Sequence, residues 1–435
     1  MNPVLLVNPA ETWKMRASNP PLGLLYIAAN LEANGIGVDV LDGFISGNAA
    51  IYEALKKGYK YVGATCLTPA RHSSIDILRK AKEYGSTTVI GGVHPTVMKK
   101  QMESAYPFID HVVAGDGEQK MVDIVHGLDT LSERVLDLDM LPSPAWHKVD
   151  LAAYPAKDRF RFNLGSLSKL ASQSIPKIAV EFSRGCSCRC TFCSAWWVKG
   201  KYRVRDPLKM ADELQELVER YGIHQIGFAD DDFATDREKV MKLCQEIIDR
   251  KLNIAWIATT RTDNIDEEIA EKMKEAGCYY VSFGIETGDP YTLQHIHKNV
   301  TIETAENAIR ICRKAGMFVN ALVIVGNFGE TIETVTATRN FLRRARPSTV
   351  SAAGGLWILP GTADYQRALR EGFITEDFWL TKTPYLVYTK ENSLETLEKF
   401  QDIIYSYSKW VWFRRQVGKL TRRLQKWLNL RRNRP

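Results

Sequence analysis

The 435-residue sequence has no apolar run of the roughly 20 residues that a membrane-spanning helix requires. The apolar residues Pro3 to Val7 are followed at once by Asn8-Pro9, which is too short a run for a signal peptide. No disulfide framework is apparent, since four of the eight cysteines are scattered among apolar neighbours. These absences predict a cytoplasmic protein whose scattered cysteines are reduced core thiols: Cys66, Cys244, Cys278 and Cys312.

Acidic residues are also absent after Asp402, where the remaining chain holds ten Lys or Arg. Subtracting these ten from the formal net charge of +7 leaves about −3 for the rest, so the basicity is local. The tail predicts a basic amphipathic helix that binds an anionic membrane surface or packs on the protein itself. Nucleic acid is not an expected partner, because no basic stripe elsewhere supports it. The apolar stripe of this helix steps by three or four residues: Trp410, Phe413, Val417, Leu420, Leu424 and Trp427.

The other four cysteines lie in one short loop, and three of them have the spacing Cys186-x3-Cys190-x2-Cys193. The loop follows an apolar run, Ile178–Val180, that predicts a strand. Three thiolates in one loop can wrap a multi-iron cluster and leave one iron without a protein ligand. A zinc site is the alternative, but it ordinarily takes ligand pairs from two segments, and no second Cys or His pair follows. Cys188 lies outside the spacing and is interpreted as a bystander.

Residues 1–130 alternate between short apolar runs and helical patterns. This alternation predicts an α/β domain with a doubly wound, mostly parallel sheet, in which ligands bind beyond the carboxyl ends of the strands. Glycines and small polar residues gather at those ends, where backbone N–H groups can approach a bulky ligand. The expected strands are Val4–Val7, Val38–Leu41, Tyr61–Thr65, Thr88–Ile90 and His111–Ala114.

Residues 131–176 are a Pro- and Ser-containing linker, and its end, Lys169–Pro176, is expected to lie near the entrance of the next domain. Alternation resumes over 177–365 and predicts a partial (β/α)6 barrel with its functional residues at the strand ends. Residues 366–435 form a mostly helical, aromatic-rich segment expected to cover the barrel mouth. The expected barrel strands are Ile178–Glu181, Gln225–Ala229, Ala255–Thr259, Tyr280–Ile285, Ala321–Val325 and Gly355–Leu359.

The cysteine spacing, with Phe192 before its last cysteine and Ser183-Arg-Gly185 before its first, resembles the radical S-adenosylmethionine (SAM) superfamily. The resemblance implies a [4Fe–4S] cluster held by Cys186, Cys190 and Cys193, with SAM on the open iron and a 5′-deoxyadenosyl radical as the product of its cleavage. By the same resemblance, SAM contacts are expected at residues that follow successive barrel strands: Asp230, Asp231, Arg261, Ser282, Glu286 and Val325.

The N-terminal turns Gly91-Gly-Val-His-Pro-Thr96 and Gly115-Asp-Gly-Glu118 resemble the Rossmann-like cobalamin-binding domain of one radical SAM branch. No Asp-x-His-x-x-Gly motif is present, so the resemblance implies base-off cobalamin without a protein ligand on cobalt. Three of the candidates, Thr68, Arg71 and His72, are expected at the lower face of the corrin. The full set of expected cobalamin contacts is Thr65, Thr68, Arg71, His72, Gly92, His94, Gly115, Gly117 and Glu118.

What this resemblance implies is a methyltransferase that acts on an unactivated carbon or phosphorus centre through a 5′-deoxyadenosyl radical and methylcobalamin. The motif set also resembles the anaerobic magnesium-protoporphyrin ester cyclase and hopanoid methylase branch, so radical cyclisation or rearrangement without methyl transfer stays open. A corrinoid-binding sensor or scaffold without catalysis is the alternative of another class. The expected partners are a small-molecule or lipid-like substrate and a one-electron donor such as flavodoxin or ferredoxin.

Overall fold

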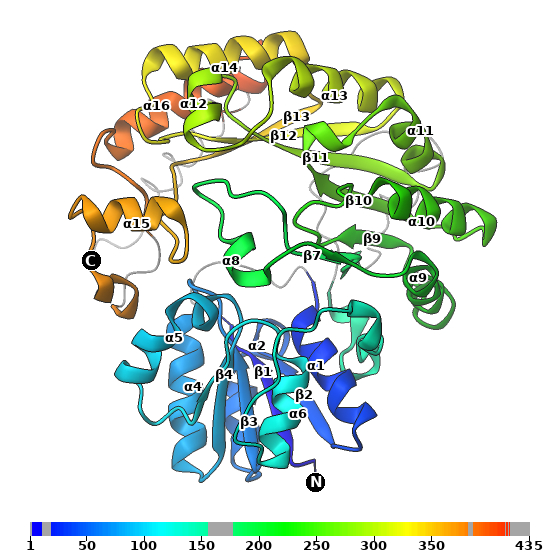
Figure 1. Ribbon diagram of the computed structural model, residues 1–435, viewed down its shortest axis with the longest axis vertical. Coiled ribbons are helices and arrows are strands. Elements are labelled where there is room, and N and C mark those ends of the chain that lie inside the picture. Colours follow the sequence, from blue (N-terminus) through cyan, green and yellow to red (C-terminus); the bar gives the residue numbers. More distant parts are fainter. Residues whose placement is uncertain are drawn as a thin grey trace, which may run out of the picture.

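The computed structural model describes residues 2–10, 19–154, 177–381, 386–413, 415 and 417. Its first half is a parallel sheet in the order β2-β1-β3-β4-β5 (Figure 1). The sheet is doubly wound, because α1 and α6 pack together on one face while α3, α4 and α5 cover the other. The strands are β1 (Val4–Asn8), β2 (Val38–Asp42), β3 (Tyr61–Thr65), β4 (Thr87–Gly91) and β5 (His111–Val112). The helices are α1 (Leu22–Ala33), α2 (Gly43–Ser46), α3 (Asn48–Leu55), α4 (Arg71–Glu83), α5 (Val93–Ala105) and α6 (Glu118–His126).

The second half is a six-stranded parallel sheet in the order β13-β12-β11-β10-β9-β6, curved into a partial barrel (Figure 1). Its helices begin at residues whose side chains accept backbone N–H groups, among them Asp206, Asp236 and Asp266. The strands are β6 (Lys177–Val180), β9 (Gln225–Phe228), β10 (Ala255–Thr260), β11 (Cys278–Glu286), β12 (Phe318–Ile324) and β13 (Thr349–Ala353). The helices are α9 (Pro207–Tyr221), α10 (Arg237–Asp249), α11 (Glu267–Glu275), α12 (Pro290–His295), α13 (Ile302–Lys314) and α14 (Ile332–Ala345).

The expected sixth barrel strand at Gly355–Leu359 is wrong, because β13 lies earlier, at Thr349–Ala353. Gly355 has φ +149°, and Trp357 forms only an isolated antiparallel bridge with Val387. The glycine pair Gly354-Gly355 therefore ends the strand. The apolar run after it leaves the sheet and packs against the N-terminal half of the molecule.

Two apolar cores each contain residues from both halves. One joins α1 and α6 to the barrel strands and the helices that cover them, and it includes Trp146 of the short helix η2 (Trp146–Lys148). The other joins α3, α4 and α5 to Trp379 and Tyr388 of the C-terminal segment. This segment contains α15 (Ala363–Arg370), η5 (Glu376–Leu380) and α16 (Leu394–Tyr405), which packs on α14. Its burial against both halves fixes how the two sheets face each other.

Among the described residues, no helix is long and apolar enough to cross a membrane. The start of the basic tail is described: Trp410 and Phe413 are exposed, and the Arg415 guanidinium donates to Asp402 on α16. The remainder of the predicted tail helix, including Leu420, Leu424 and Trp427, lies outside the described residues, as do Lys169–Pro176.

Candidate functional site

The cysteine loop lies between the two halves of the molecule. It leaves the short strand β7 (Ser183–Arg184), which pairs antiparallel with β8 (Arg203–Val204), and it ends in α8 (Ala195–Lys199). Figure 1 shows α8 between the N-terminal sheet and the barrel. Thr191 ties the loop to the barrel and to the C-terminal segment, since its N–H donates to the Ile296 carbonyl and its carbonyl accepts from the N–H of Asp364 on α15, both at 3.1 Å. These bonds hold the loop from both sides.

The three spaced cysteines fit an iron–sulfur cluster. All are free thiols and all are partly exposed. Backbone N–H groups of Cys188 and Ala195 point at Sγ of Cys186 and Cys193, at 3.4 and 3.5 Å, and such bonds stabilise a thiolate. No three His, Cys, Asp or Glu side chains in the described ranges converge on one point. In a multi-iron cluster each thiolate binds a different iron, so its sulfurs need not converge.

Asp230, expected as a SAM contact, anchors the start of the cysteine loop. Its carboxylate accepts the backbone N–H of Phe182 at 3.2 Å and both the N–H and the hydroxyl of Ser183, at 2.6 and 2.5 Å. Burial raises the pKa of Asp230 to about 7 despite these bonds. The carboxylate therefore already has three donors from the strand that leads into the cysteines.

The two acids that follow are also engaged by protein groups. Asp231 lies 3.3 Å from Lys199 Nζ and accepts the N–H of Gly185 at 3.2 Å. Asp232 accepts from Thr260 Oγ1 at 2.7 Å and from the N–H of Arg261 at 3.0 Å. The three successive carboxylates thus brace the cysteine loop and the end of β10. A SAM contact by Asp230 or Asp231 stays a prediction.

Polar side chains at the ends of β10 and β11 form a second group. Arg261 makes a two-pronged bond to Asp263, at 2.9 and 2.7 Å, and donates to the carbonyl of Lys298 at 3.0 Å. Lys298 Nζ lies 2.9 Å from Glu286 Oε1, and Glu286 adopts φ +62° at the end of β11. Lys298 was not expected from the sequence, because it follows α12 in an irregular stretch with no recognisable spacing. Of the remaining expected SAM contacts, Ser282 lies on β11 near Asn320, and Val325 is buried just after β12.

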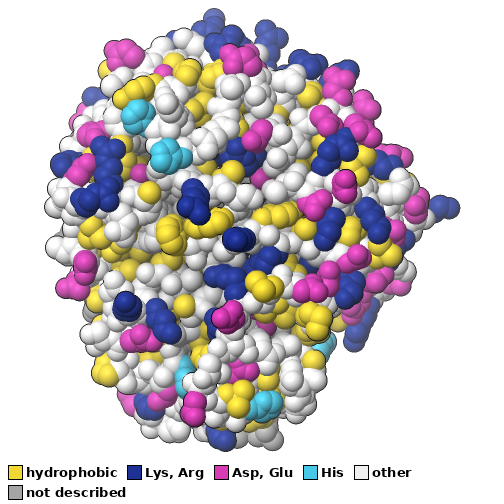
Figure 2. Space-filling view, viewed as in Figure 1, with side chains coloured by type: hydrophobic (Ala, Val, Ile, Leu, Met, Phe, Trp, Pro, Cys, Tyr) yellow, Lys and Arg dark blue, Asp and Glu magenta, His cyan; other side chains and the backbone are white. Residues whose placement is uncertain are grey.

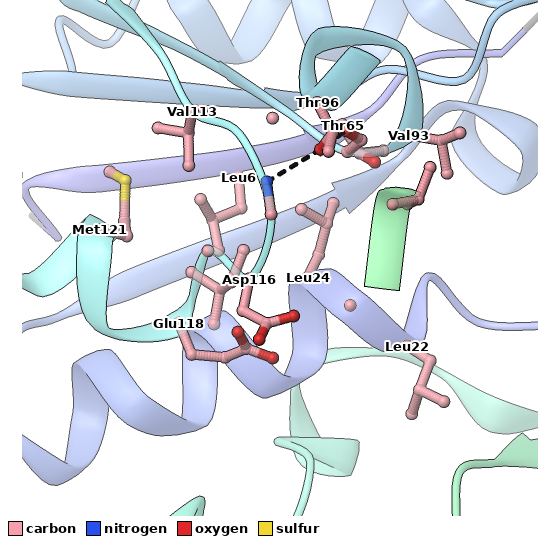
Figure 3. A pocket seen from close by; sticks show the side chains of 18 of the residues that line it. Leu6, Leu22, Leu24, Thr65, Val93, Thr96, Val113, Asp116, Glu118 and Met121 are labelled. Atoms are coloured by element: carbon pink, nitrogen blue, oxygen red, sulfur yellow. Dashed lines mark hydrogen bonds between the residues drawn. The ribbon is translucent and has the colours of Figure 1, made fainter. Parts of the chain in front are cut away.

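A cavity of about 380 Å³ lies between the N-terminal sheet and the start of the barrel half. Figure 3 shows its N-terminal wall. The N-terminal half contributes most of its wall, which is largely apolar and includes Leu24, Val93 and Met121. The barrel half contributes residues that flank the cysteine loop, Arg184 and Lys199 among them. The cavity therefore adjoins the cysteine loop. Five of the expected cobalamin contacts line it: Thr65, Gly92, Gly115, Gly117 and Glu118.

Gly92 is required where the wall comes closest to the β3 loop. It has φ +109°, and an added Cβ would lie 3.0 Å from the carbonyl oxygen of Cys66 and 3.2 Å from Thr65 Oγ1. A side chain here would be strained and would press on the backbone that forms the cavity.

The other four expected cobalamin contacts do not line the cavity. Arg71 is buried and donates to the carbonyls of Thr68 and Thr381, both at 2.6 Å, with its guanidinium over the Trp379 ring. His94 Nδ1 lies 3.2 Å from Thr68 Oγ1, and burial lowers the pKa of His94 to about 3. The C-terminal segment covers Arg71 on α4, and Thr68, Arg71 and His72 do not line the cavity. Their expected position at the lower face of the corrin stays a prediction. Leu67 lies at the cavity instead.

One side of the cavity carries ion pairs between the two halves. Arg184 Nη1 lies 2.7 Å from Glu118 Oε1 and Arg203 Nη1 lies 2.7 Å from Asp116 Oδ2. Figure 3 shows Asp116 and Glu118 beside each other, and Figure 2 shows Lys and Arg side chains gathered across the middle of one face of the molecule. Arg184 also pairs with Glu181 at 2.5 Å. The cysteine loop is thus tied to the turn that precedes α6.

Comparison with protein families gives two matches. Residues 180–342 match the radical SAM superfamily and residues 14–125 match the B12 binding domain. The solved structure of OxsB, a cobalamin-dependent S-adenosylmethionine radical enzyme, with aqua-cobalamin bound, has a TM-score of 0.71 at 17% identity, over 86% of this chain and 62% of that one. The methyltransferase TsrM from Kitasatospora setae, with cobalamin and a [4Fe-4S] cluster bound, has a TM-score of 0.67 at 22% identity, over 85% and 78%. These likenesses concern the fold.

Curated relatives are closer in sequence. The anaerobic magnesium-protoporphyrin IX monomethyl ester cyclase of Rubrivivax gelatinosus is 32% identical over 357 residues, which are 77% of this chain and 64% of the cyclase. This chain thus spans less than two thirds of that relative. An uncharacterized methyltransferase of Pyrococcus horikoshii, PH0819, is 30% identical over 364 residues, 79% of this chain and 78% of that protein. With both family matches and this relative covered over most of its length, the chain belongs to the radical SAM superfamily, in the branch that carries a B12-binding domain before the radical SAM domain.

Proposed function

We propose that this chain is a cobalamin-dependent radical SAM methyltransferase that acts on an unactivated carbon or phosphorus centre of a small molecule. The cavity carries the proposal. The glycine-bearing strand ends of the B12-binding domain form one wall, and residues on either side of the cysteine loop form the other. A cofactor in this cavity would lie beside the loop that fits an iron–sulfur cluster, as the transfer of a methyl group to a substrate radical requires.

Each part of the site has a proposed role. Cys186, Cys190 and Cys193 would hold the cluster, and Glu286, Lys298 and Arg261 offer charged groups to SAM beside it. When bound, SAM and the cluster supply the deoxyadenosyl radical, and cobalamin supplies the methyl group. The chain orients these groups and keeps water from the radical through the apolar wall of the cavity.

Products of SAM distinguish this proposal from its alternatives. Reconstituted, reduced holoenzyme is expected to convert SAM into both 5′-deoxyadenosine and S-adenosylhomocysteine. Removal of cobalamin should abolish S-adenosylhomocysteine while 5′-deoxyadenosine persists. Release of 5′-deoxyadenosine alone, with cobalamin present, would favour a radical cyclase, since several relatives are magnesium-protoporphyrin ester cyclases. Release of neither product would favour a corrinoid-binding scaffold.

A one-electron donor such as flavodoxin or ferredoxin is proposed as a partner, because each SAM cleavage consumes one electron that must be replaced from an external reductant. Reduced flavodoxin should replace dithionite in the product assay. Failure of both flavodoxin and ferredoxin to support turnover, when dithionite does, would remove these two carriers as partners.

A contact with anionic membranes is proposed for the start of the tail. Trp410, Trp412 and Phe413 are exposed large apolar side chains, and the sequence beyond them is basic. The salt link from Arg415 to Asp402 ties this stretch to α16 and is what packing on the protein itself predicts. Truncation after Ser408 should abolish sedimentation with phosphatidylserine vesicles, and W410A/F413A should reduce it. Unchanged sedimentation of the truncated chain would leave self-packing as the explanation.

A further inference from the structure

The carboxylate of Glu118 has one engaged oxygen and one without a partner. Glu118 begins α6, lines the cavity and is 3% exposed. Its Oε1 accepts from Arg184 Nη1 at 2.7 Å, whereas Oε2 is buried without a hydrogen-bond partner. Among the described residues that line the cavity, it is the one buried side-chain nitrogen or oxygen in this condition. Burying a carboxylate oxygen without a hydrogen bond is costly, so a molecule bound in the cavity is expected to donate a hydrogen bond to it.

Arg184 connects Glu118 to the start of the cysteine loop. Its guanidinium also bonds Glu181 at 2.5 Å and lies over the ring of Tyr26, 5.0 Å from the centroid. The next residue, Gly185, has φ +83°, and an added Cβ there would lie 2.4 Å from the carbonyl oxygen of Gly200. This close approach leaves little freedom between the guanidinium and Cys186, so a shift of Arg184 moves the first cysteine.

The charges around Glu118 define what Oε2 can accept. Asp116 lies beside it and faces Arg203 at 2.7 Å, Arg134 at 3.7 Å and Arg184 at 3.8 Å, so both acids already have cationic partners. An added anion would meet Asp116 and Glu118 together. A neutral N–H donor would complete the unpaired oxygen of Glu118 without separating these ion pairs. Primary amides, which surround the corrin ring of cobalamin, are donors of this kind.

We propose that Glu118 is a positioning residue that accepts a hydrogen bond from one peripheral amide N–H of the corrin through Oε2, while Oε1 stays on Arg184. The inference rests on the proposed function, since it takes cobalamin as the occupant. It adds that the seating of the corrin is transmitted through Arg184 to Cys186. The binding of the corrin and the geometry of the cysteine loop are then coupled.

The test uses cobalamin derivatives in which one peripheral primary amide is hydrolysed to a carboxylate. Reconstituted full-length protein, freed of cobalamin, is titrated with hydroxocobalamin and with each derivative, and Kd is measured by absorbance. Wild type should bind one derivative at least tenfold more weakly than intact hydroxocobalamin, because its carboxylate faces Glu118. In E118Q that penalty should disappear, because the Gln amide can donate to the carboxylate. A merely structural role would lower all affinities equally.

Further variants keep the outcome decisive. E118D keeps the negative charge on a shorter side chain, so it should bind every cobalamin more weakly than wild type. It should still bind the carboxylate derivative at least tenfold more weakly than hydroxocobalamin, and this comparison can be made even if E118Q binds poorly. R184K cannot bond Glu118 and Glu181 together, so it should reduce the penalty and alter the electron paramagnetic resonance spectrum of the reduced cluster. E32Q is the control, because Glu32 pairs with Lys148 away from the cavity.

Two failures are distinguishable. Wild type that binds no cobalamin would overturn the proposed function, and this inference with it. If wild type binds hydroxocobalamin but shows the same order of affinities for the derivatives as E118Q, only the role of Glu118 is overturned.

Discussion

Lys298 Nζ and Glu286 Oε1 form a 2.9 Å ion pair at the mouth of the barrel, with both side chains almost fully shielded from solvent. Burial lowers the pKa of Lys298, but the charges of Glu286 and Cys190 and the hydrogen bond to Glu286 together more than offset it, so the net pKa is raised. A buried pair of this kind leaves a costly uncompensated charge when one partner is removed.

Replacing Lys298 should therefore affect both stability and SAM binding. K298M is expected to lower the free energy of unfolding by about 3 kcal/mol, the order found for a broken buried pair. It should also weaken SAM binding at least tenfold, and K298R should recover most of both losses. K314M is the matched control, because Lys314 pairs with Glu267 at the surface. Equal SAM affinity in K298M and wild type would contradict a role at the SAM site.

The cysteines should separate into three ligands and one bystander. C186S, C190S and C193S are each expected to lose the visible absorbance of the iron–sulfur cluster and to release no 5′-deoxyadenosine. C188S should keep the cluster and most of the activity. Iron and sulfide analysis of reconstituted proteins checks this assignment, and loss of the cluster in C188S would overturn it.

Asp230 should matter more for the cysteine loop than for SAM affinity. D230A leaves the N–H groups of Phe182 and Ser183 without their acceptor, which should cost about 2 to 4 kcal/mol and lower the yield of reconstituted cluster. The fraction of D230A protein that carries a complete cluster is expected to bind SAM with nearly the affinity of wild type. A large rise in the SAM Kd of that fraction would instead identify Asp230 as the SAM contact expected from the sequence.

Gly92 should be required for cobalamin. In G92A, the new methyl group would press on the β3 loop, so retention of cobalamin through gel filtration is expected to fall at least tenfold. G58A is the control, since Gly58 also has positive φ, at +76°, but has open space around its Cα. G58A should lower the free energy of unfolding by about 1 kcal/mol, because alanine disfavours positive φ, but it does not contact the cavity. Equal retention by both variants would remove the steric argument.

Glu330 should make stability depend on pH. Burial raises the pKa of this carboxyl to about 7, although it accepts the N–H of Gly326. The folded pKa exceeds the unfolded value, so between about pH 4 and pH 7 the folded chain binds more protons. This contribution therefore destabilises progressively as pH rises through that window, by at most about 3 kcal/mol, and then levels off. Urea denaturation from pH 5 to 8 should show this slope in wild type and a shallower one in E330Q.

Most strands of both sheets could be predicted from the sequence because they are largely buried and read as short, mainly apolar runs. Val4–Val7 is wholly buried between helices, and the helices of the barrel begin at residues such as Asp236 that cap them. The sixth barrel strand was misplaced for the same reason: Leu356 and Ile358 are buried and apolar, but against the N-terminal half rather than in the sheet.

Contacts between the two halves could not be predicted, because they depend on how the halves meet. Nothing in the spacing around Arg184 or Arg203 indicates that they pair with Glu118 and Asp116. Arg71 and His94 follow strands as cofactor contacts do, yet η5 covers Arg71 from a segment 300 residues away. The sequence places Asp230 and Asp231 after a strand, as SAM contacts would be, but it does not show that backbone N–H groups already engage Asp230.

Trp379 and Tyr388 are buried in the core of α3, α4 and α5, so the N-terminal half depends on the C-terminal segment. A fragment ending after the B12-binding sequence would expose an apolar surface where these rings belong, and it should aggregate rather than act as a portable corrin module. Grafting that half onto another barrel would require carrying the distant segment with it. Recombination is therefore expected to transmit the two halves and the C-terminal segment together.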